Sequence, residues 1–269
     1  MKRGAVEPGT AWALVTGAGS GIGRCYALRL AALGYDVALV GEAEAPLQAV
    51  RAEIEAATAR RVRTIACDLA RMESAGELIA QLEAAAIEPD VVINNAGIFS
   101  FCDVLHTPPE RLERMLLLHD MTATKLCRHF AAQFIARGVR GHILNMSSYS
   151  LWMPFPGLAV YSASKAYLKA FSVAFAKEVR ETGIRITAIC PAGVATDLYG
   201  LSPRWQRIGL RLGVLISADS CARRALRALW RGRRCSVPDW WNRLWIPLLV
   251  ALPMWIIRPL RRFTMKYQK

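Results

Sequence analysis

The sequence predicts an α/β fold, a doubly wound parallel sheet with helices on both faces. Short β-branched runs alternate with longer amphipathic stretches from residue 12 to residue 190. Strand, helix and strand at this spacing form βαβ units, which place parallel strands side by side under covering helices. The chain has 269 residues, no internal repeat and no low-complexity linker. We therefore expect a single domain.

Each element is predicted from its hydrophobic periodicity. Six short apolar runs are predicted to be strands: residues 12–16, 36–40, 63–67, 90–94, 142–146 and 185–190. Five amphipathic stretches are predicted to be helices: residues 25–33, 45–57, 74–85, 111–137 and 162–181. Beyond the sixth strand this rhythm changes, and we predict a helix over residues 217–231 and a short strand over residues 235–238.

The composition is moderately apolar, and its charge is unevenly distributed. Apolar residues make up 54 % of the chain and charged residues 21 %. Residues 199–269 carry 15 Lys/Arg and two Asp/Glu, so they hold almost all of the net charge of +14. The seven cysteines form no CxxC pair, which predicts buried free thiols in a reducing compartment and no metal site. No apolar stretch precedes Trp12, so we expect no signal peptide and a cytoplasmic location.

Tyr161 and Lys165 are the residues that indicate chemistry most directly. They stand four positions apart in a predicted helix, a spacing that places two side chains on one face. A lysine ammonium near a phenol favours the phenolate, so we expect the pKa of Tyr161 to lie below its usual value of about 10. Ser148 follows the strand predicted at residues 142–146 and could bind an oxygen presented to Tyr161. Together the three residues indicate proton transfer at a carbonyl or carbinol oxygen.

A glycine-rich turn follows the first predicted strand. It reads Thr16-Gly17-Ala18-Gly19-Ser20-Gly21-Ile22-Gly23 and runs into a helix. Glycines in this place allow a tight turn, a close approach of backbone to a pyrophosphate, and close packing of the helix on the sheet. The helix N-terminus also offers free N–H groups to phosphate. Because the turn follows a strand and opens a βαβ unit, it predicts a Rossmann-type dinucleotide site.

Six motifs in order resemble those of the short-chain dehydrogenase/reductase family, over about residues 10–200. They are Thr16-Gly17-x3-Gly21-x-Gly23, Asp68, Asn94-Asn95-Ala96-Gly97, Ser148, Tyr161-x3-Lys165 and Pro191-Ala192-Gly193-Val194-Ala195-Thr196. The resemblance implies an NAD(P)-dependent enzyme that transfers a hydride, with Tyr161 as general acid/base. It further implies that Ser148 orients the substrate carbonyl and that Lys165 holds the nicotinamide ribose.

The same resemblance implies a set of cofactor-binding residues around the strand ends. The set is Gly17, Ser20, Gly21, Ile22, Gly23, Glu42, Asp68, Leu69, Asn95, Ala96, Gly97, Tyr161, Lys165, Pro191, Gly193 and Thr196. Within it, Asp68 and Leu69 would approach the adenine, and Thr196 would contact the nicotinamide carboxamide.

Glu42, just after the second predicted strand, favours NAD(H) over NADP(H). The adenosine ribose of a bound dinucleotide lies at the end of this strand. A carboxylate accepts hydrogen bonds from ribose hydroxyls and repels a 2′-phosphate. Relatives that bind NADP usually carry a basic residue at the position of Glu42 or at that of Ser20.

His119 departs from the family pattern, in which an asparagine helps to hold a water that links the lysine to solvent. An imidazole can bind such a water and can carry a proton. We therefore predict that His119 joins Ser148, Tyr161 and Lys165 as a catalytic residue. The alternative is a helix histidine that fills space.

The last quarter of the chain differs from the rest. We predict a dinucleotide-binding and catalytic core over residues 1–198, and a substrate lid with a hydrophobic, basic, Trp-rich C-terminal extension over residues 199–269. The uncharged stretch 244–257 is too short to span a bilayer but suits its interface. This predicts peripheral contact with an anionic membrane, at its inner face; a lid or a subunit contact are the alternatives. No nucleic-acid motif accompanies the charge.

An apolar mouth near a membrane predicts a lipophilic ketone or secondary alcohol as substrate, 3-oxoacyl- or steroid-like, and the basic tail would suit an acidic carrier. Candidate pocket walls are Phe99, Phe101, Tyr149, Leu151, Trp152, Met153 and Phe155. Relatives commonly pair through the helices predicted at residues 111–137 and 162–181, so we expect a homo-oligomer. The alternative function is a catalytically weak dinucleotide-binding relative that regulates a membrane or a partner.

Overall fold

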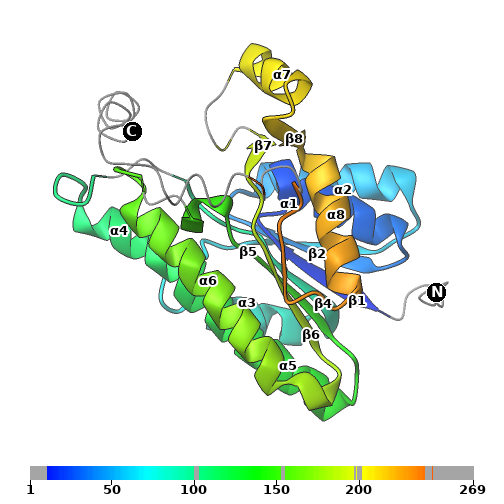
Figure 1. Cartoon of the computed structure of the whole chain (residues 1–269). Coiled ribbons are helices and arrows are strands. Elements are labelled where there is room, and N and C mark those ends of the chain that lie inside the picture. Colours follow the sequence, from blue (N-terminus) through cyan, green and yellow to red (C-terminus); the bar gives the residue numbers. More distant parts are fainter. Residues whose placement is uncertain are drawn as a thin grey trace.

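A seven-stranded sheet forms the centre of the molecule (Figure 1). The computed structural model describes residues 11–99, 103–152, 155–196, 198, 202–239 and 244. The strand order is β3-β2-β1-β4-β5-β6-β9, and every pair is parallel. The strands are β1 (Trp12–Thr16), β2 (Asp36–Gly41), β3 (Val62–Ala66), β4 (Pro89–Asn94), β5 (His142–Met146), β6 (Arg185–Ile189) and β9 (Cys235–Ser236). The predicted doubly wound parallel sheet is confirmed.

Helices cover both faces of this sheet, as predicted. One face carries α1 (Gly21–Ala32), α2 (Glu44–Ala57) and α8 (Ala218–Trp230). The other carries α3 (Ser74–Ala84), α5 (Ala123–Arg137) and α6 (Ala159–Glu178), with α4 (Pro109–Leu116) beside α6. Among the described residues, no helix is long and apolar enough to cross a bilayer.

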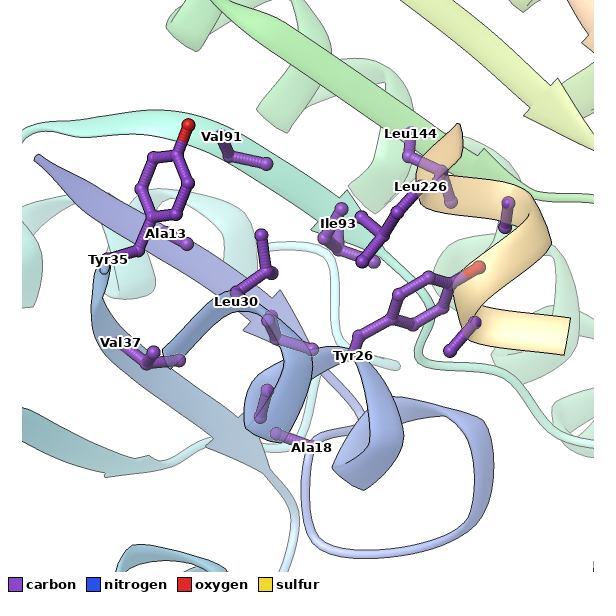
Figure 2. Close-up of a cluster of buried hydrophobic side chains, with 14 of the residues drawn as sticks. Ala13, Ala18, Tyr26, Leu30, Tyr35, Val37, Val91, Ile93, Leu144 and Leu226 are labelled. Carbon is purple, nitrogen blue, oxygen red and sulfur yellow. The ribbon is translucent and has the colours of Figure 1, made fainter. Parts of the chain in front are cut away.

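Apolar side chains from α1 and α8 form one core against β1, β4 and β5. Figure 2 shows the Tyr26 ring of α1 next to α8, in one buried cluster with Leu226 of α8 and Ile93 of β4. Tyr26 is fully buried, and its hydroxyl contacts the Met146 sulfur at 3.1 Å. This packing fixes the carboxyl ends of β4 and β5 relative to the start of α1, where the glycine turn lies.

The helix predicted at residues 111–137 is interrupted. It consists of α4, a π-helical stretch over Leu117–Thr122, and α5. A π-helical turn adds one residue to the ladder and so rotates the side chains that follow, and such turns are frequent at functional sites. The sequence did not reveal it, because the apolar spacing continues across the stretch.

A second, two-stranded parallel sheet joins β7 (Gly193–Ala195) to β8 (Leu215–Ser217), with α7 (Pro203–Arg211) between them in the chain. The sequence analysis did not predict these elements, since strands of three residues are too short to show an alternating pattern. After β8, α8 and β9 complete the main sheet and its covering layer. The Trp-rich stretch at residues 244–257 lies outside the described residues, apart from Leu244.

Candidate active site

The carboxyl ends of β1, β4, β5 and β6 surround a cavity of about 340 Å³. It lies where the strand order reverses between β1 and β4, the place where ligands bind in doubly wound sheets. Most of the predicted site residues line it. They are Gly17, Ser20, Gly21, Ile22, Asn95, Ala96, Gly97, His119, Ser148, Tyr161, Lys165, Pro191 and Thr196.

Glycines shape one wall of the cavity because side chains would not fit there. Gly17 has φ +64°, and a Cβ on it would lie 2.9 Å from the Ala96 Cα. Gly21 has φ +52°, a left-handed conformation that favours glycine. A Cβ on Gly23 would lie 1.9 Å from the Gly17 carbonyl oxygen. Gly17 and Gly21 line the cavity itself, whereas Gly23 closes the turn behind it.

Asn95 ties the end of β4 to the glycine turn. Its side-chain amide donates to the carbonyls of Thr16 and Gly17 at 3.1 Å and 3.3 Å. The backbone N–H groups of Asn95 and Ala96 in turn donate to the Thr16 hydroxyl, each at 3.0 Å. These bonds hold the two strand ends together at the floor of the cavity.

The opposite wall carries Ser148, Tyr161 and Lys165, all of them buried. The Ser148 hydroxyl is hydrogen-bonded to the Tyr161 phenol and accepts from the Ser150 N–H at 3.2 Å. The Lys165 ammonium donates to the Met146 carbonyl at 3.1 Å and lies 5.7 Å from the centre of the Tyr161 ring. The predicted spacing thus does bring the three side chains together, with α6 supplying two of them and the end of β5 the third.

The expected lowering of the Tyr161 pKa is corrected by the structure. Burial raises the pKa of Tyr161 to about 12, and the hydrogen bond from Ser148 acts in the opposite direction. The spacing of Tyr161 and Lys165 does not predict this higher pKa. A buried phenolate loses its hydration, which raises the pKa, and the Lys165 ammonium lies over the Tyr161 ring. Burial also lowers the pKa of Lys165 to about 8. At neutral pH, Tyr161 is therefore a protonated phenol beside a charged Lys165.

Both ring nitrogens of His119 are occupied by groups of the chain. Nε2 accepts from the Ile98 N–H at 3.1 Å, and Nδ1 lies 2.9 Å from the Ser164 hydroxyl. Since Ser164 donates its proton to the Tyr161 carbonyl at 2.8 Å, Nδ1 is the donor to Ser164. Burial, together with the nearby Lys165, lowers the pKa of His119 well below its usual value. A neutral imidazole with both nitrogens engaged does not favour the predicted role as a carrier of protons.

Asp120, the next residue in the π-helical stretch, was missed by the sequence analysis. Its Oδ1 is buried and has no hydrogen-bond partner among the described residues. Burial raises the pKa of Asp120 to about 7, while Lys165 acts to lower it; Asp120 in turn raises the pKa of Lys165. The negative charge of Asp120 and the positive charge of Lys165 therefore stabilise each other. The only signal in the sequence is that Asp120 adjoins His119.

Five predicted residues do not line the cavity: Gly23, Glu42, Asp68, Leu69 and Gly193. Asp68 accepts from the Ala70 N–H at 2.9 Å and pairs with Arg114 of α4 at 3.0 Å. Leu69 is buried, and its carbonyl accepts from the Thr122 hydroxyl. Glu42 is exposed. Gly193 belongs to β7, where a Cβ would lie 2.4 Å from Leu215.

The predicted pocket walls divide into two clusters. Phe99 and Phe155 pack near Tyr161, and the Phe99 ring meets the Tyr161 ring edge-on at 5.0 Å. Three others, Tyr149, Leu151 and Trp152, pack with Cys190 and Val237. Phe101 and Met153 lie outside the described residues. The cavity also has apolar lining that the sequence analysis did not assign to the site: Ile98, Met146, Val194 and Leu198.

The residues present fit a dinucleotide. The glycine wall leaves room that any other side chain would fill, and it opens directly into the N-terminus of α1, where free N–H groups favour phosphate. No carboxylate is among the described residues that line the cavity, and Lys165 adds a positive charge. A glycine cradle beside a Ser-Tyr-Lys cluster, at the switch point of a doubly wound sheet, defines a dehydrogenase-type site.

Comparison with known proteins names the family. A family model described as short chain dehydrogenase matches residues 11–207, and the chain belongs to this family. It is 34 % identical over 183 residues to a very-long-chain 3-oxoacyl-CoA reductase of Pyricularia oryzae, covering 65 % of this chain and 54 % of that protein. It is 33 % identical over 188 residues to the 17-beta-hydroxysteroid dehydrogenase type 3 of Rattus norvegicus, covering 70 % of this chain and 61 % of that protein.

A solved structure extends the likeness over almost the whole chain. It is a short-chain dehydrogenase from Sphingobium yanoikuyae in complex with NADPH, with a TM-score of 0.76 and 28 % sequence identity. The match covers 90 % of this chain and 96 % of that one. This chain spans only part of the curated relatives that it matches, from 31 % of the length of one to 73 % of the length of another.

Proposed function

We propose that this protein is an NAD(P)-dependent reductase of lipophilic ketones. The observation that carries the proposal is the buried Tyr161, hydrogen-bonded to Ser148 and close to Lys165, on a cavity whose other wall is a glycine cradle. A bound nicotinamide dinucleotide would supply the hydride. The protein would supply position, polarity and the proton.

Tyr161 acts as the general acid in this proposal. A pKa of about 12 keeps the phenol protonated at neutral pH, which is the state needed to donate a proton as a carbonyl oxygen becomes an alkoxide. Ser148 already directs its hydroxyl at the phenol oxygen. A carbonyl oxygen that enters between them would accept from both hydroxyls, which favours reduction as the working direction.

Lys165 supplies positive charge next to the developing alkoxide, a type of stabilisation that is often large in enzymes. Its pKa of about 8 leaves it mostly charged at neutral pH. We assign Asp120, rather than His119, as the group that supports this charge, because the Asp120 carboxyl raises the pKa of Lys165. His119 instead positions Ile98 and Ser164 around Tyr161 through its two hydrogen bonds.

The cofactor is expected to be NAD(H) in preference to NADP(H), on the basis of Glu42. Glu42 directly follows β2 and is exposed, so its carboxylate is free to meet a ribose in the adenosine region and would repel a 2′-phosphate there. A solved relative is in complex with NADPH. The preference is therefore tested by comparing the KM values for NADH and NADPH.

The substrate class follows from the lining and from the relatives. Ile98, Met146, Val194 and Leu198 give the cavity an apolar part of its described lining, and the relatives include a 3-oxoacyl-CoA reductase and a hydroxysteroid dehydrogenase. We propose a ketone carried on a long acyl chain or a fused-ring skeleton, free or on an acidic carrier. Residues 199–269 would include the segment that covers it.

Two of the predicted contacts remain proposals. A homo-oligomer would use the outer faces of α5 and α6, where the half-exposed rings of Tyr167, Phe171 and Phe175 stack in a row. Membrane contact through residues 244–257 concerns a stretch that lies outside the described residues.

A substrate panel tests the proposed function. Purified protein is assayed for oxidation of NADH and NADPH with 3-oxoacyl-CoA thioesters of increasing chain length and with steroid ketones. Tyr161→Phe is expected to lower kcat by at least about a hundred-fold. Tyr167→Phe, on an exposed part of the same helix, is the matched control and should retain activity. No turnover with any ketone, or full activity in Tyr161→Phe, would contradict the proposal.

A further inference from the structure

The helix α7 exposes an apolar surface that the proposed reaction does not explain. It contains no buried residue. Trp205 is 61 % exposed, and Leu212 and Val214, just after the helix, are 72 % and 63 % exposed. Leu198 and Leu210 are also exposed. Scattered exposed apolar residues need no explanation, but a contiguous group does.

Apolar and basic residues form adjacent stripes along this helix. Trp205, Ile208 and Leu212 follow one another at spacings of three and four, so they share one face. Arg204, Arg207 and Arg211 repeat the same spacing one position earlier and lie alongside. From Leu198 to Ala218 the sequence contains no Asp or Glu. None of the three arginines forms an ion pair with the part of the chain that the structure describes.

This helix lies beside the mouth of the cavity. Gln206 donates to the carbonyl of Thr196 at 3.4 Å, and both Thr196 and Leu198 line the cavity. β7 and β8 hold the two ends of the α7 segment together. In Figure 1, α7 stands out from the body of the molecule beyond the carboxyl ends of the strands.

We propose that α7 docks on an anionic lipid surface, with the stripe of Trp205, Ile208 and Leu212 entering the bilayer interface and the adjacent arginines meeting lipid phosphates. Aromatic and aliphatic side chains next to arginines on one short helix are the features of an interfacial helix. Charge argues against a two-fold contact with a second copy, which would bring the same three arginines together. Closure on the cavity is disfavoured by the pairing of β7 with β8, which holds both ends of the segment while α7 stands out from the body of the molecule.

The position of α7 next to the cavity has a consequence for the entry of a ligand. An interfacial helix next to Thr196 and Leu198 would hold the mouth of the cavity against the lipid, so that a lipophilic ligand could pass between bilayer and cavity without crossing water. The docking itself requires neither a cofactor nor turnover. It can therefore be tested separately from the proposed reaction.

Amide hydrogen exchange on the full chain tests the proposal. Exchange is measured alone, with vesicles of phosphatidylcholine, and with vesicles of phosphatidylcholine and phosphatidylglycerol. We expect the anionic vesicles to slow exchange over residues 203–214 several-fold, and neutral vesicles to have a smaller effect. Unchanged exchange in this segment overturns the proposal, even when the chain binds the vesicles through another segment.

Variants assign the contact to side chains. Trp205→Glu combined with Leu212→Glu should remove the protection that anionic vesicles give to residues 203–214. Leu33→Glu is the matched control, since Leu33 is 47 % exposed at the end of α1, and it should show the same protection over residues 203–214 as the parent chain. Circular dichroism verifies that each variant is folded. Equal protection in the double variant and the parent would contradict docking through this stripe.

Discussion

Burial sets the ionisation of the residues at the centre of the site. Tyr161, Lys165 and His119 are each at most 6 % exposed, and in each the uncharged form gains from the loss of hydration. The same physical cause thus raises the pKa of the phenol and lowers those of the amine and the imidazole. At neutral pH, Tyr161 is therefore a protonated phenol, and Lys165 is mostly charged because its pKa is about 8. His119 is a neutral imidazole that bridges two hydrogen-bond partners.

Asp120→Asn should shift the pH dependence of catalysis. The Asp120 carboxylate raises the pKa of Lys165, which is about 8, so its removal lowers that pKa. The Lys165 charge is lost as the pH rises through its pKa, and the alkaline fall of kcat/KM should therefore begin at a lower pH in the variant. Asp219→Asn, at the surface of α8, is the control. An alkaline limb that stays in place would show that Asp120 does not support Lys165.

His119→Gln should reduce the sensitivity of stability to acid. The folded-state pKa of His119 lies well below 6.5, so below that pH the unfolded chain binds a proton that the folded chain does not. The free energy of unfolding then falls as the pH decreases, by up to about 1.4 kcal/mol per pH unit for one such histidine. Urea unfolding between neutral pH and pH about 5 measures this slope. The slope should be smaller in His119→Gln than in the parent chain, and an equal slope in both would contradict the buried, neutral state of His119.

At the scale of the elements, the glycine turn depends on backbone contacts that admit no side chain. Gly23→Ala would place a methyl group 1.9 Å from the Gly17 carbonyl oxygen, so the turn between β1 and α1 must open. We expect dinucleotide binding, measured by calorimetry, to weaken at least about tenfold, an order-of-magnitude estimate for a displaced phosphate cradle. This binding measurement tests the proposed cofactor site.

Gly76→Ala provides the matched control for this substitution. Gly76 lies in α3 with nothing within 4 Å of an added Cβ. Because alanine suits a helix interior better than glycine, this variant should be more stable by roughly 0.5–1 kcal/mol and should bind dinucleotide normally. Equal binding by Gly23→Ala and Gly76→Ala would show that the turn does not hold the cofactor.

Across the whole molecule, α8 joins the C-terminal part of the chain to the main core. Leu226 is 4 % exposed and packs with Tyr26 and the strands (Figure 2). Leu226→Ala is expected to lower the free energy of unfolding by about 2–5 kcal/mol, measured by urea denaturation. Leu212→Ala, at a position that is 72 % exposed, should change it by less than about 0.5 kcal/mol. A small effect of both would mean that α8 is not part of the cooperative core.

The sequence predicted the sheet, all seven of its strands and most of the cavity lining, because these depend on local periodicity and on short motifs. Strands β1 and β5 have the predicted ends, residues 12–16 and 142–146. Ionisation could not be predicted in this way: the spacing of Tyr161 and Lys165 shows that they meet, whereas the pKa of Tyr161 depends on burial by distant segments. The π-helical stretch and β7–β8 leave no periodic signal, so Asp120 and the exposure of α7 became visible only in three dimensions.

Isotope transfer tests the central claim most directly. The protein is incubated with a 3-oxoacyl-CoA or steroid ketone and with NADH or NADPH deuterated at the reactive carbon of the nicotinamide, and the product is analysed by mass spectrometry. We predict an alcohol with deuterium at the former carbonyl carbon, formed at least about a hundred-fold more slowly by Tyr161→Phe. A product without deuterium, or the same rate in Tyr161→Phe, would contradict a reductase that uses Tyr161 as its acid.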